Sequence, residues 1–161
     1  MNNEYWNEIV EACYRDIYSY AYRIMTSVHD AEEVTQDTFL QAFKSLKGEE
    51  KLEQVRPWLF KVARNKCIDR KRWWKRWSLL KRSFFSHEPK IEADTQCIDF
   101  SPINALPKRQ KEILLLRHWH GFSTAETAKI LGINEGTVKS HLKRAVEKVK
   151  LAILERNDKK V

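Results

Sequence analysis

The sequence is poor in the residues that interrupt helices. Its 161 residues include four glycines and four prolines. Long amphipathic runs accompany this scarcity, with apolar residues recurring every three or four positions. The two observations together predict an almost entirely helical chain.

Cysteine is also scarce, and no long uncharged apolar run is present. Cys13, Cys67 and Cys97 lack the spacing of a metal site, so we expect reduced thiols. No N-terminal signal and no candidate membrane span are recognisable. We therefore expect a cytoplasmic protein that is neither secreted nor membrane-spanning.

The net charge of +8 is distributed unevenly along the chain. Residues 1–54 carry a net charge of −6, and residues 56–82 carry +10 with a single acidic side chain. Residues 83–102 come to −3 and residues 103–161 to +7. An acidic first part and two separate basic blocks indicate one surface for a protein partner and two for a polyanion.

Helical periodicity divides the chain into two parts. A first helix is predicted over residues 4–25, and a second from Asp30, as an N-cap whose capping box is completed by Glu33. A third begins at Arg56-Pro57 and extends to about Trp77. Periodicity disappears over residues 78–102 and then returns. We predict an all-α protein with two small helical domains, 1–77 and 103–161, joined by a flexible linker, 78–102.

The second helix has two apolar residues on its polar side. Val34, Thr38 and Ala42 share the face suited to the core, whereas Leu40 and Phe43 fall on roughly the opposite side among acidic residues. Two exposed apolar side chains in such surroundings indicate a docking patch for a helical partner. Isolated surface apolar residues are the alternative interpretation.

The third helix combines cations with aromatic residues. One face holds Lys61, Arg64, Asn65, Ile68 and Arg72, and the sequence continues as Arg72-Trp-Trp-Lys-Arg-Trp77. Cations that follow phosphates and rings that stack on unpaired bases suit single-stranded nucleic acid. Core positions for the tryptophans are the alternative, which we favour for Trp58. Trp73, Trp74 and Trp77 lie too close together for all three to be buried.

The C-terminal part contains the features of a helix-turn-helix over residues 123–148. Ser123 and Glu126 form a capping box, Gly132 allows the left-handed turn, and Asn134 caps the next helix. Ala128 permits close helix approach, and Val138 fills the space between the helices. The outward face of the second helix, which we expect in the major groove of DNA, carries Thr137, Lys139, Ser140, Lys143 and Arg144, with His141 at its edge. A solvated helix face is the alternative.

In this order, the motifs resemble the extracytoplasmic-function (ECF) sigma factors of bacterial RNA polymerase. Asp30–Phe39 resembles the segment that docks on the clamp helices of the largest subunit, and Arg56–Arg72 the segment that opens and recognises the −10 element. Ala105–Arg117 and Gly136–His141 resemble the domain that recognises the −35 element. The resemblance covers nearly the whole chain outside the linker.

The resemblance implies the roles of particular residues. Polymerase contacts fall to Asp30, Glu33, Gln36, Asp37 and Phe39, on the same helix as Leu40 and Phe43. Contacts with the −10 element fall to Lys61, Arg64, Asn65, Asp69, Arg72 and Trp73, and a loop at about 47–55 helps capture a flipped base. Contacts with the −35 element fall to Thr137, Lys139, Ser140, His141, Lys143 and Arg144.

The implied partners are core RNA polymerase, through its clamp helices and flap, and promoter DNA, both duplex and melted. An anti-sigma factor, which in this family is often membrane-anchored, is implied as well. The chain would initiate transcription of a stress- or signal-responsive regulon. It would have no catalytic residues, no metal site and no cofactor, since the polymerase supplies the chemistry.

Two other functions fit parts of the sequence. A stand-alone repressor or response-regulator effector has a similar helix-turn-helix but no use for the Arg56–Trp77 block. A metal-dependent enzyme could use His118, His120 and Cys97. The two histidines alternate by two on an expected helix end, however, which splays their rings, and no carboxylate-rich site accompanies them.

Overall fold

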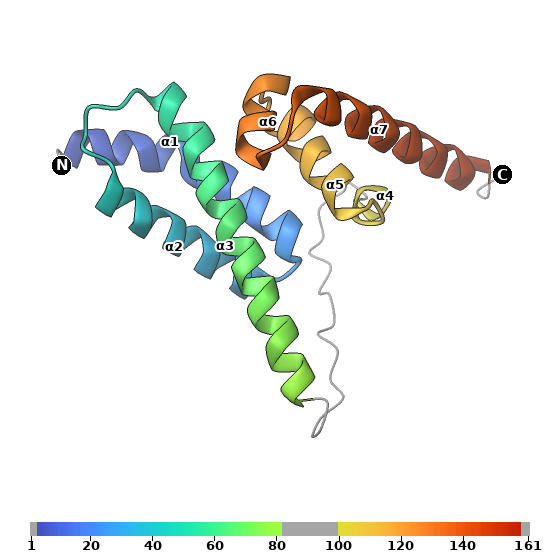
Figure 1. Ribbon diagram of the computed structural model, residues 1–161, viewed down its shortest axis with the longest axis horizontal. Coiled ribbons are helices and arrows are strands. Elements are labelled where there is room, and N and C mark those ends of the chain that lie inside the picture. Colours follow the sequence, from blue (N-terminus) through green and yellow to red (C-terminus); the bar gives the residue numbers. More distant parts are fainter. Residues whose placement is uncertain (1–2, 82–99, 159–161) are drawn as a thin grey trace. The chain divides into compact units, whose positions relative to one another are not determined.

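A computed structural model describes residues 3–81 and 100–158. The chain forms two compact units, which we describe separately (Figure 1). Within the described ranges, every regular element is a helix, as the sequence predicts. Most of the expected linker, 78–102, lies outside the described residues, although residues 78–81 and 101–102 at its two ends are helical.

Over the described residues 3–81, the first unit contains three long helices, α1 (Asn3–Met25), α2 (Val28–Ser45) and α3 (Leu52–Lys81). Each packs on the other two around a core that includes Cys13, Ile17, Val34 and Leu59. The rings of Tyr20 and Phe60 meet edge to face with centroids 5.4 Å apart. The core face predicted for the second helix, with Val34, Thr38 and Ala42, is therefore confirmed.

The start of α2 differs from the prediction. Ser27, in an extended conformation, is the N-cap, and its hydroxyl accepts a hydrogen bond from the backbone N–H of Asp30 at 3.3 Å. Asp30 is therefore a first-turn residue, not the cap, and its carboxylate bonds to α3. Thr26, with φ of 57°, turns the chain between the two helices.

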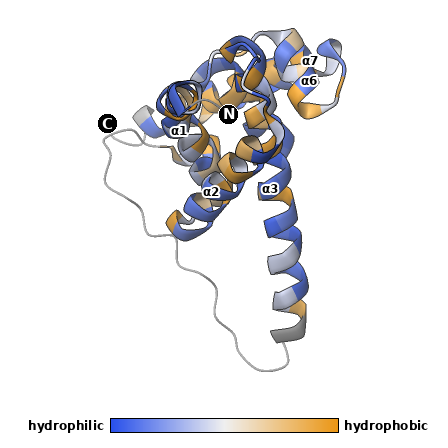
Figure 2. Cartoon of the chain, turned by 90° about the vertical axis from the view of Figure 1, so that its left-hand side faces the viewer, coloured by the Kyte–Doolittle hydropathy of each residue, from blue (hydrophilic) through white to orange (hydrophobic). Residues whose placement is uncertain are grey.

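The third helix begins and ends beyond its expected limits. It starts at Leu52, four residues before Arg56, so Pro57 lies inside the helix. The cost is one hydrogen bond, that to the carbonyl of Glu53, an exposed residue. The helix also continues past Trp77 to Lys81, and the side chains of residues 71–79 are all exposed. Figures 1 and 2 show this part of α3 extending past α1 and α2.

Within residues 100–158, the second unit contains four α-helices and a π-helical turn. α4 (Ser101–Asn104) leads to α5 (Lys108–Leu114), which continues into the π-helical turn Leu115–Trp119. α6 (Thr124–Leu131) and the long α7 (Glu135–Asp158) follow. The core contains Ile113, Leu116, Phe122, Ile130 and Val138. α7 continues to Asp158, past residue 148, the expected end of the helix-turn-helix.

Candidate nucleic-acid and partner-binding surfaces

The outer face of α2 exposes two large apolar side chains. Leu40 is 57% exposed and Phe43 55%, next to the exposed Gln36 and Asp37. The ring of Trp6 in α1 contacts Phe43 edge to face, with centroids 5.3 Å apart. The exposure predicted for Leu40 and Phe43 is thus confirmed, and α1 contributes an aromatic support that the sequence pattern did not indicate.

Two residues expected on this face lie inside the unit. Phe39 is 7% exposed, with its ring centroid 6.1 Å from that of Trp6 and 5.6 Å from that of Tyr14. Asp30 is 8% exposed. Phe39 and Asp30 therefore fix the helix that carries the exposed face, and in this structure they offer little surface of their own.

Asp30 belongs to a polar network between α2 and α3. Arg70 donates from Nε to Oδ1 of Asp30 and pairs through Nη1 with Glu33. Trp74 donates from Nε1 to the same Asp30 oxygen at 3.2 Å. Burial raises the pKa of Asp30, but the bonds from Arg70, Trp74 and Ser27 outweigh it and hold that pKa below its ordinary value.

The sequence pattern does not identify either α3 member of this network. Arg70 and Trp74 are four residues apart and so project from the same side of the helix. That spacing marks a shared face, but it does not identify α2 as the surface that the face meets.

The opposite side of α3 carries an exposed polar stripe. Lys61, Asn65 and Arg72 are exposed at helical spacing, and Ile68 between them is half-buried. Asp69 is exposed beside the stripe, with a carboxylate oxygen 3.9 Å from Nη1 of Arg72. The structure thus brings most of the residues expected at the −10 element onto one side, while Arg64 is half-buried at its edge.

The three neighbouring tryptophans do not share that stripe. Trp73 is 48% exposed, and Trp74 and Trp77 are each 42% exposed. Trp73 and Trp77 stack with centroids 5.7 Å apart and planes within 7°. Since successive helical residues are about 100° apart, Trp73 and Trp77 lie roughly 100° and 140° from Arg72. Cations and rings that alternate in the sequence are therefore separated on the surface. Trp58, which we expected in the core, is half-buried.

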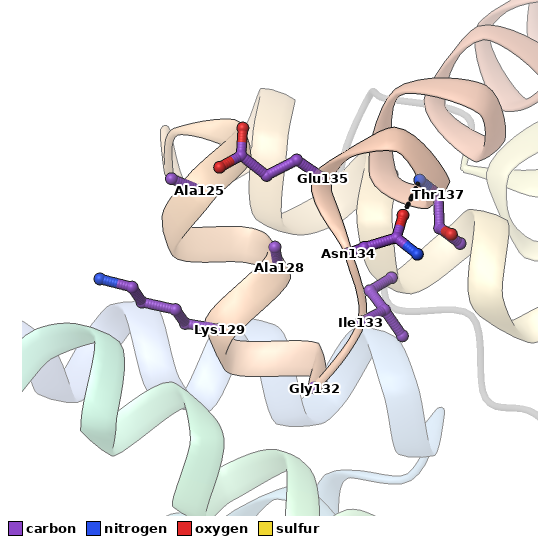
Figure 3. A pocket seen from close by; sticks show the side chains of 8 residues that line it. All are labelled: Ala125, Ala128, Lys129, Gly132, Ile133, Asn134, Glu135 and Thr137. Carbon is purple, nitrogen blue, oxygen red and sulfur yellow. Dashed lines mark hydrogen bonds between the residues drawn. The ribbon is translucent and has the colours of Figure 1, made fainter.

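The turn of the helix-turn-helix has the predicted geometry. Ser123 Oγ accepts from the N–H of Glu126 at 3.1 Å, and the Glu126 carboxylate accepts from the N–H of Ser123 at 2.7 Å. Gly132 has φ of 65°. Asn134 Oδ1 accepts from the N–H of Thr137 at 2.7 Å, which caps α7 (Figure 3). The caps and the left-handed glycine are confirmed.

The first turns of α7 carry the expected outward face. Lys139, Ser140, Lys143 and Arg144 are exposed. A shallow groove opens between α6 and the start of α7, lined by Lys129, Gly132, Asn134, Glu135 and Thr137 among others (Figure 3). His141 is half-buried, with Nδ1 enclosed, at the boundary between this face and the core.

A second, apolar groove lies elsewhere in the same unit. Ile103, Leu114, Leu115, Trp119, Val146 and Val149 line it together with His118 and Lys150. Farther along α7, Leu151, Ile153 and Leu154 are each about half-exposed or more. No sequence pattern indicates this surface, because residues from α4, the π-helical turn and α7 meet there only in the fold.

Neither a metal cluster nor a membrane span is found in the described residues. No group of three His, Cys, Asp or Glu side chains in residues 3–81 and 100–158 could hold a metal ion. His118 is exposed and His120 buried, and Cys97 lies outside the described residues. Within the same ranges, no helix combines the length and the apolar character needed to cross a bilayer.

Comparison with known families gives two matches in chain order. Residues 9–77 match the model of Sigma-70 region 2, and residues 103–149 match that of Sigma-70, region 4. The ECF RNA polymerase sigma factor SigL of Mycobacterium tuberculosis is 30% identical over 148 residues, covering 86% of this chain and 83% of SigL. SigM of Bacillus subtilis is 28% identical, covering 89% of this chain and 92% of SigM.

Another ECF sigma factor, SigE of Mycolicibacterium smegmatis, is 26% identical over 159 residues, and the match spans 60% of that protein's length. Two solved structures have a similar fold. The sigma factor RpoE of Bartonella quintana, in complex with the anti-sigma factor NepR, gives a TM-score of 0.74 at 24% identity over 91% of this chain and 95% of that one. CnrH, in complex with the cytosolic domain of CnrY, gives a TM-score of 0.68 at 23% identity. The match covers 96% of this chain and 90% of CnrH. The chain belongs to the ECF sigma factors of RNA polymerase, within the sigma-70 family.

Proposed function

We propose that the outer face of α2 is the surface that binds core RNA polymerase. Gln36, Asp37, Leu40 and Phe43 would make the direct contacts, with Glu33 at the edge of the face. Asp30 and Phe39, the other expected contacts, act by holding α2 in place. The observation that carries this proposal is the exposure of Leu40 and Phe43, since a large apolar pair ringed by polar groups is typical of a protein-binding site.

We propose that the exposed stripe of α3 binds the −10 element. Lys61 and Arg72 would neutralise phosphates, and Asn65 and Asp69 would contact bases of the melted strand. The loop directly before α3 would receive a flipped base. It consists of residues 47–51, because residues 52–55, which we expected in the loop, belong to α3. Arg64 and Trp73 would contact the DNA from the edges of the stripe, because Arg64 is half-buried and Trp73 lies to one side.

The first turns of α7 would occupy the major groove of the −35 element. Thr137, Lys139, Ser140, Lys143 and Arg144 supply the donors and cations that such a helix uses on base edges and phosphates. His141, whose Nδ1 is enclosed, would have only its other ring nitrogen for DNA. In this proposal the −10 element is bound by the N-terminal domain, 1–77, and the −35 element by the C-terminal domain, 103–161. The linker, 78–102, joins the two domains.

The apolar groove of the second unit suits an apolar segment of the polymerase flap. An anti-sigma factor is the further partner we propose, since the RpoE and CnrH structures are complexes with NepR and with the cytosolic domain of CnrY. The protein would act in the cytoplasm on a stress- or signal-responsive regulon. It would use no cofactor and perform no catalysis itself.

Run-off transcription tests this assignment directly. Core polymerase and the full chain are incubated with a promoter library randomised at both elements. Transcripts from a defined subset of templates are expected, with sequence preference at both positions. Binding to duplex DNA without any transcript would instead favour the stand-alone repressor, which needs neither the α2 face nor the α3 stripe.

A further inference from the structure

The loop between α2 and α3 is folded around one carboxylate. Glu50 Oε1 accepts from the backbone N–H of Lys47 at 3.0 Å. Glu50 Oε2 accepts from the N–H groups of Gly48 and Glu49 at 3.1 and 3.2 Å. Gly48 has φ of 89°, the left-handed conformation that brings successive N–H groups to one side. Three consecutive backbone donors thus form a concave anion site that a side chain of the loop itself occupies.

The same residue is joined to the first helix. The Tyr5 hydroxyl donates to the backbone carbonyl oxygen of Glu50 at 3.0 Å and lies 3.2 Å from its Oε2. Tyr5 and Glu50 are 45 positions apart, so this contact fixes the loop to α1. The Glu50 carboxylate closes the same loop on itself. Slight burial and the bond with the Glu50 carboxylate raise the pKa of Tyr5.

The backbone donors keep the carboxylate ionised. The N–H of Lys47 contributes most, followed by those of the other loop residues, and together they lower the pKa of Glu50 from 4.5 to about 2. The charge that organises the loop is therefore present throughout the neutral range. Because those N–H groups are already bonded, they are poorly placed to bind a DNA phosphate.

We propose that Glu50 is a positioning residue for recognition of the −10 element, and that it holds loop 47–51 in the shape that receives a promoter base. Tyr5 anchors that shape to α1. The inference rests on the proposed function of the loop. Its physical basis is preorganisation, because a loop fixed before binding loses less conformational entropy when DNA arrives and admits fewer alternative bases.

The Glu50→Gln variant tests the role without a change in side-chain size. An amide has one acceptor oxygen where the carboxylate has two, and its NH₂ group faces backbone donors. Glu53→Gln is the matched control, since it removes the same charge three residues away, on an exposed position of α3. Tyr5→Phe removes only the hydroxyl and so tests the anchor to α1.

Each variant is assembled with core polymerase and transcribed from two libraries, one randomised at the −10 element and one at the −35 element. For Glu50→Gln we expect discrimination between bases at the −10 position to fall roughly tenfold, less than the roughly hundredfold that a 1 Å misplacement can cost. Preference at the −35 element should stay unchanged. Tyr5→Phe should give an intermediate loss, and Glu53→Gln should match the unmodified chain.

Two outcomes overturn the proposal. One is an unchanged −10 preference in Glu50→Gln, and the other is an equal loss at both elements, which would mean a general defect. Hydrogen exchange provides a readout independent of DNA, because the amides of Lys47, Gly48 and Glu49 should exchange faster in Glu50→Gln, and unchanged exchange would overturn the premise. If the unmodified chain itself has no −10 preference, the proposed function fails instead.

Discussion

Arg70 in α3 donates its Nε–H to Oδ1 of Asp30 near the start of α2. The same guanidinium pairs with Glu33 one turn further along α2. The side chains of Asp30 and Arg70 are 12% and 24% exposed, so the pair is largely shielded from water. The acidic motif at the start of α2 thus has an internal role, which is to hold α3 against α2 just before α3 extends past the bundle.

Asp30→Asn should destabilise the first unit. The change removes the charge that neutralises Arg70 and weakens the bonds that Arg70 and Trp74 donate to this position, while the pair with Glu33 stays. We expect a loss of about 1–3 kcal/mol in the free energy of unfolding, as for other shielded groups deprived of a partner. Urea denaturation followed by tryptophan fluorescence measures it. Glu32→Gln, at an exposed position of α2, is the control and should lower the free energy of unfolding far less.

The same pair gives the first unit an acid-dependent stability. Hydrogen bonds hold the pKa of Asp30 below its ordinary value of 3.8, despite burial, so the folded state binds a proton less readily than the unfolded chain. The stabilisation is complete above pH 3.8 and is lost as the pH falls through the lower, folded pKa. When the free energy of unfolding is measured as a function of pH, the unmodified chain should lose this stabilisation in acid. Asp30→Asn should not show that loss, and identical pH profiles for the two chains would contradict the prediction.

Leu40→Ala should weaken binding to core polymerase while leaving the fold intact. The side chain is 57% exposed, so the isolated chain gains little from it, whereas an interface that covers it would lose roughly 1–2 kcal/mol. That corresponds to about a tenfold rise in Kd, measurable by fluorescence anisotropy with labelled chain. Val28→Ala, an exposed apolar position elsewhere on α2, is the control. Phe39→Ala would not serve, because Phe39 is packed between Trp6 and Tyr14.

The sequence predicts well those features that depend on neighbours within a few residues. Ser123 with Glu126, Gly132 and Asn134 each act within one helical turn, and each has the predicted geometry. The exposure of Leu40 and Phe43 follows from the helical period of the apolar residues alone. The fold class and the family could therefore be inferred before any coordinates.

Contacts between distant segments could not be predicted in the same way. Asp30 is of a residue type that often caps helices, but Ser27 caps α2, and the Asp30 carboxylate is bound by Arg70, forty residues away. The tryptophans of α3 alternate with cations in the sequence, and only the helical rotation separates them from the stripe of Lys61 and Arg72. Glu50 shows no pattern at all, since its role depends on Gly48 turning the chain.

Arg144→Ala should reduce affinity for −35 duplex DNA and lower its salt dependence. Arg144 is exposed on the outward face of α7, one turn after Ser140. If it contacts a phosphate, the slope of log K against log salt should decrease by about one, and if it contacts a guanine the loss should be specific to sequence. Titration of a −35 duplex at several salt concentrations measures both. Lys108→Ala, an exposed cation on α5, should leave binding to the duplex unchanged.

Two glycines at the helix-turn-helix should respond differently to substitution by alanine. Gly132 has φ of 65° and ends α6, so alanine there must adopt a left-handed backbone, even though no atom lies within 4 Å of its new Cβ. We expect Gly132→Ala to cost about 1–2 kcal/mol of unfolding free energy from backbone strain alone. Gly136 lies in the first turn of α7, and a Cβ there would be 3.4 Å from Asn134 Oδ1, the edge of ordinary contact.

Gly136→Ala should therefore be neutral or stabilising by up to about 1 kcal/mol, because alanine favours the helix. Thermal denaturation of the full chain, monitored by circular dichroism, compares the two variants in the same unit. A stabilised Gly132→Ala would contradict the left-handed turn, and with it the angle at which α7 leaves α6. DNA binding should follow stability for Gly132→Ala. For Gly136→Ala it should instead report whether the start of α7 tolerates a methyl group beside the DNA.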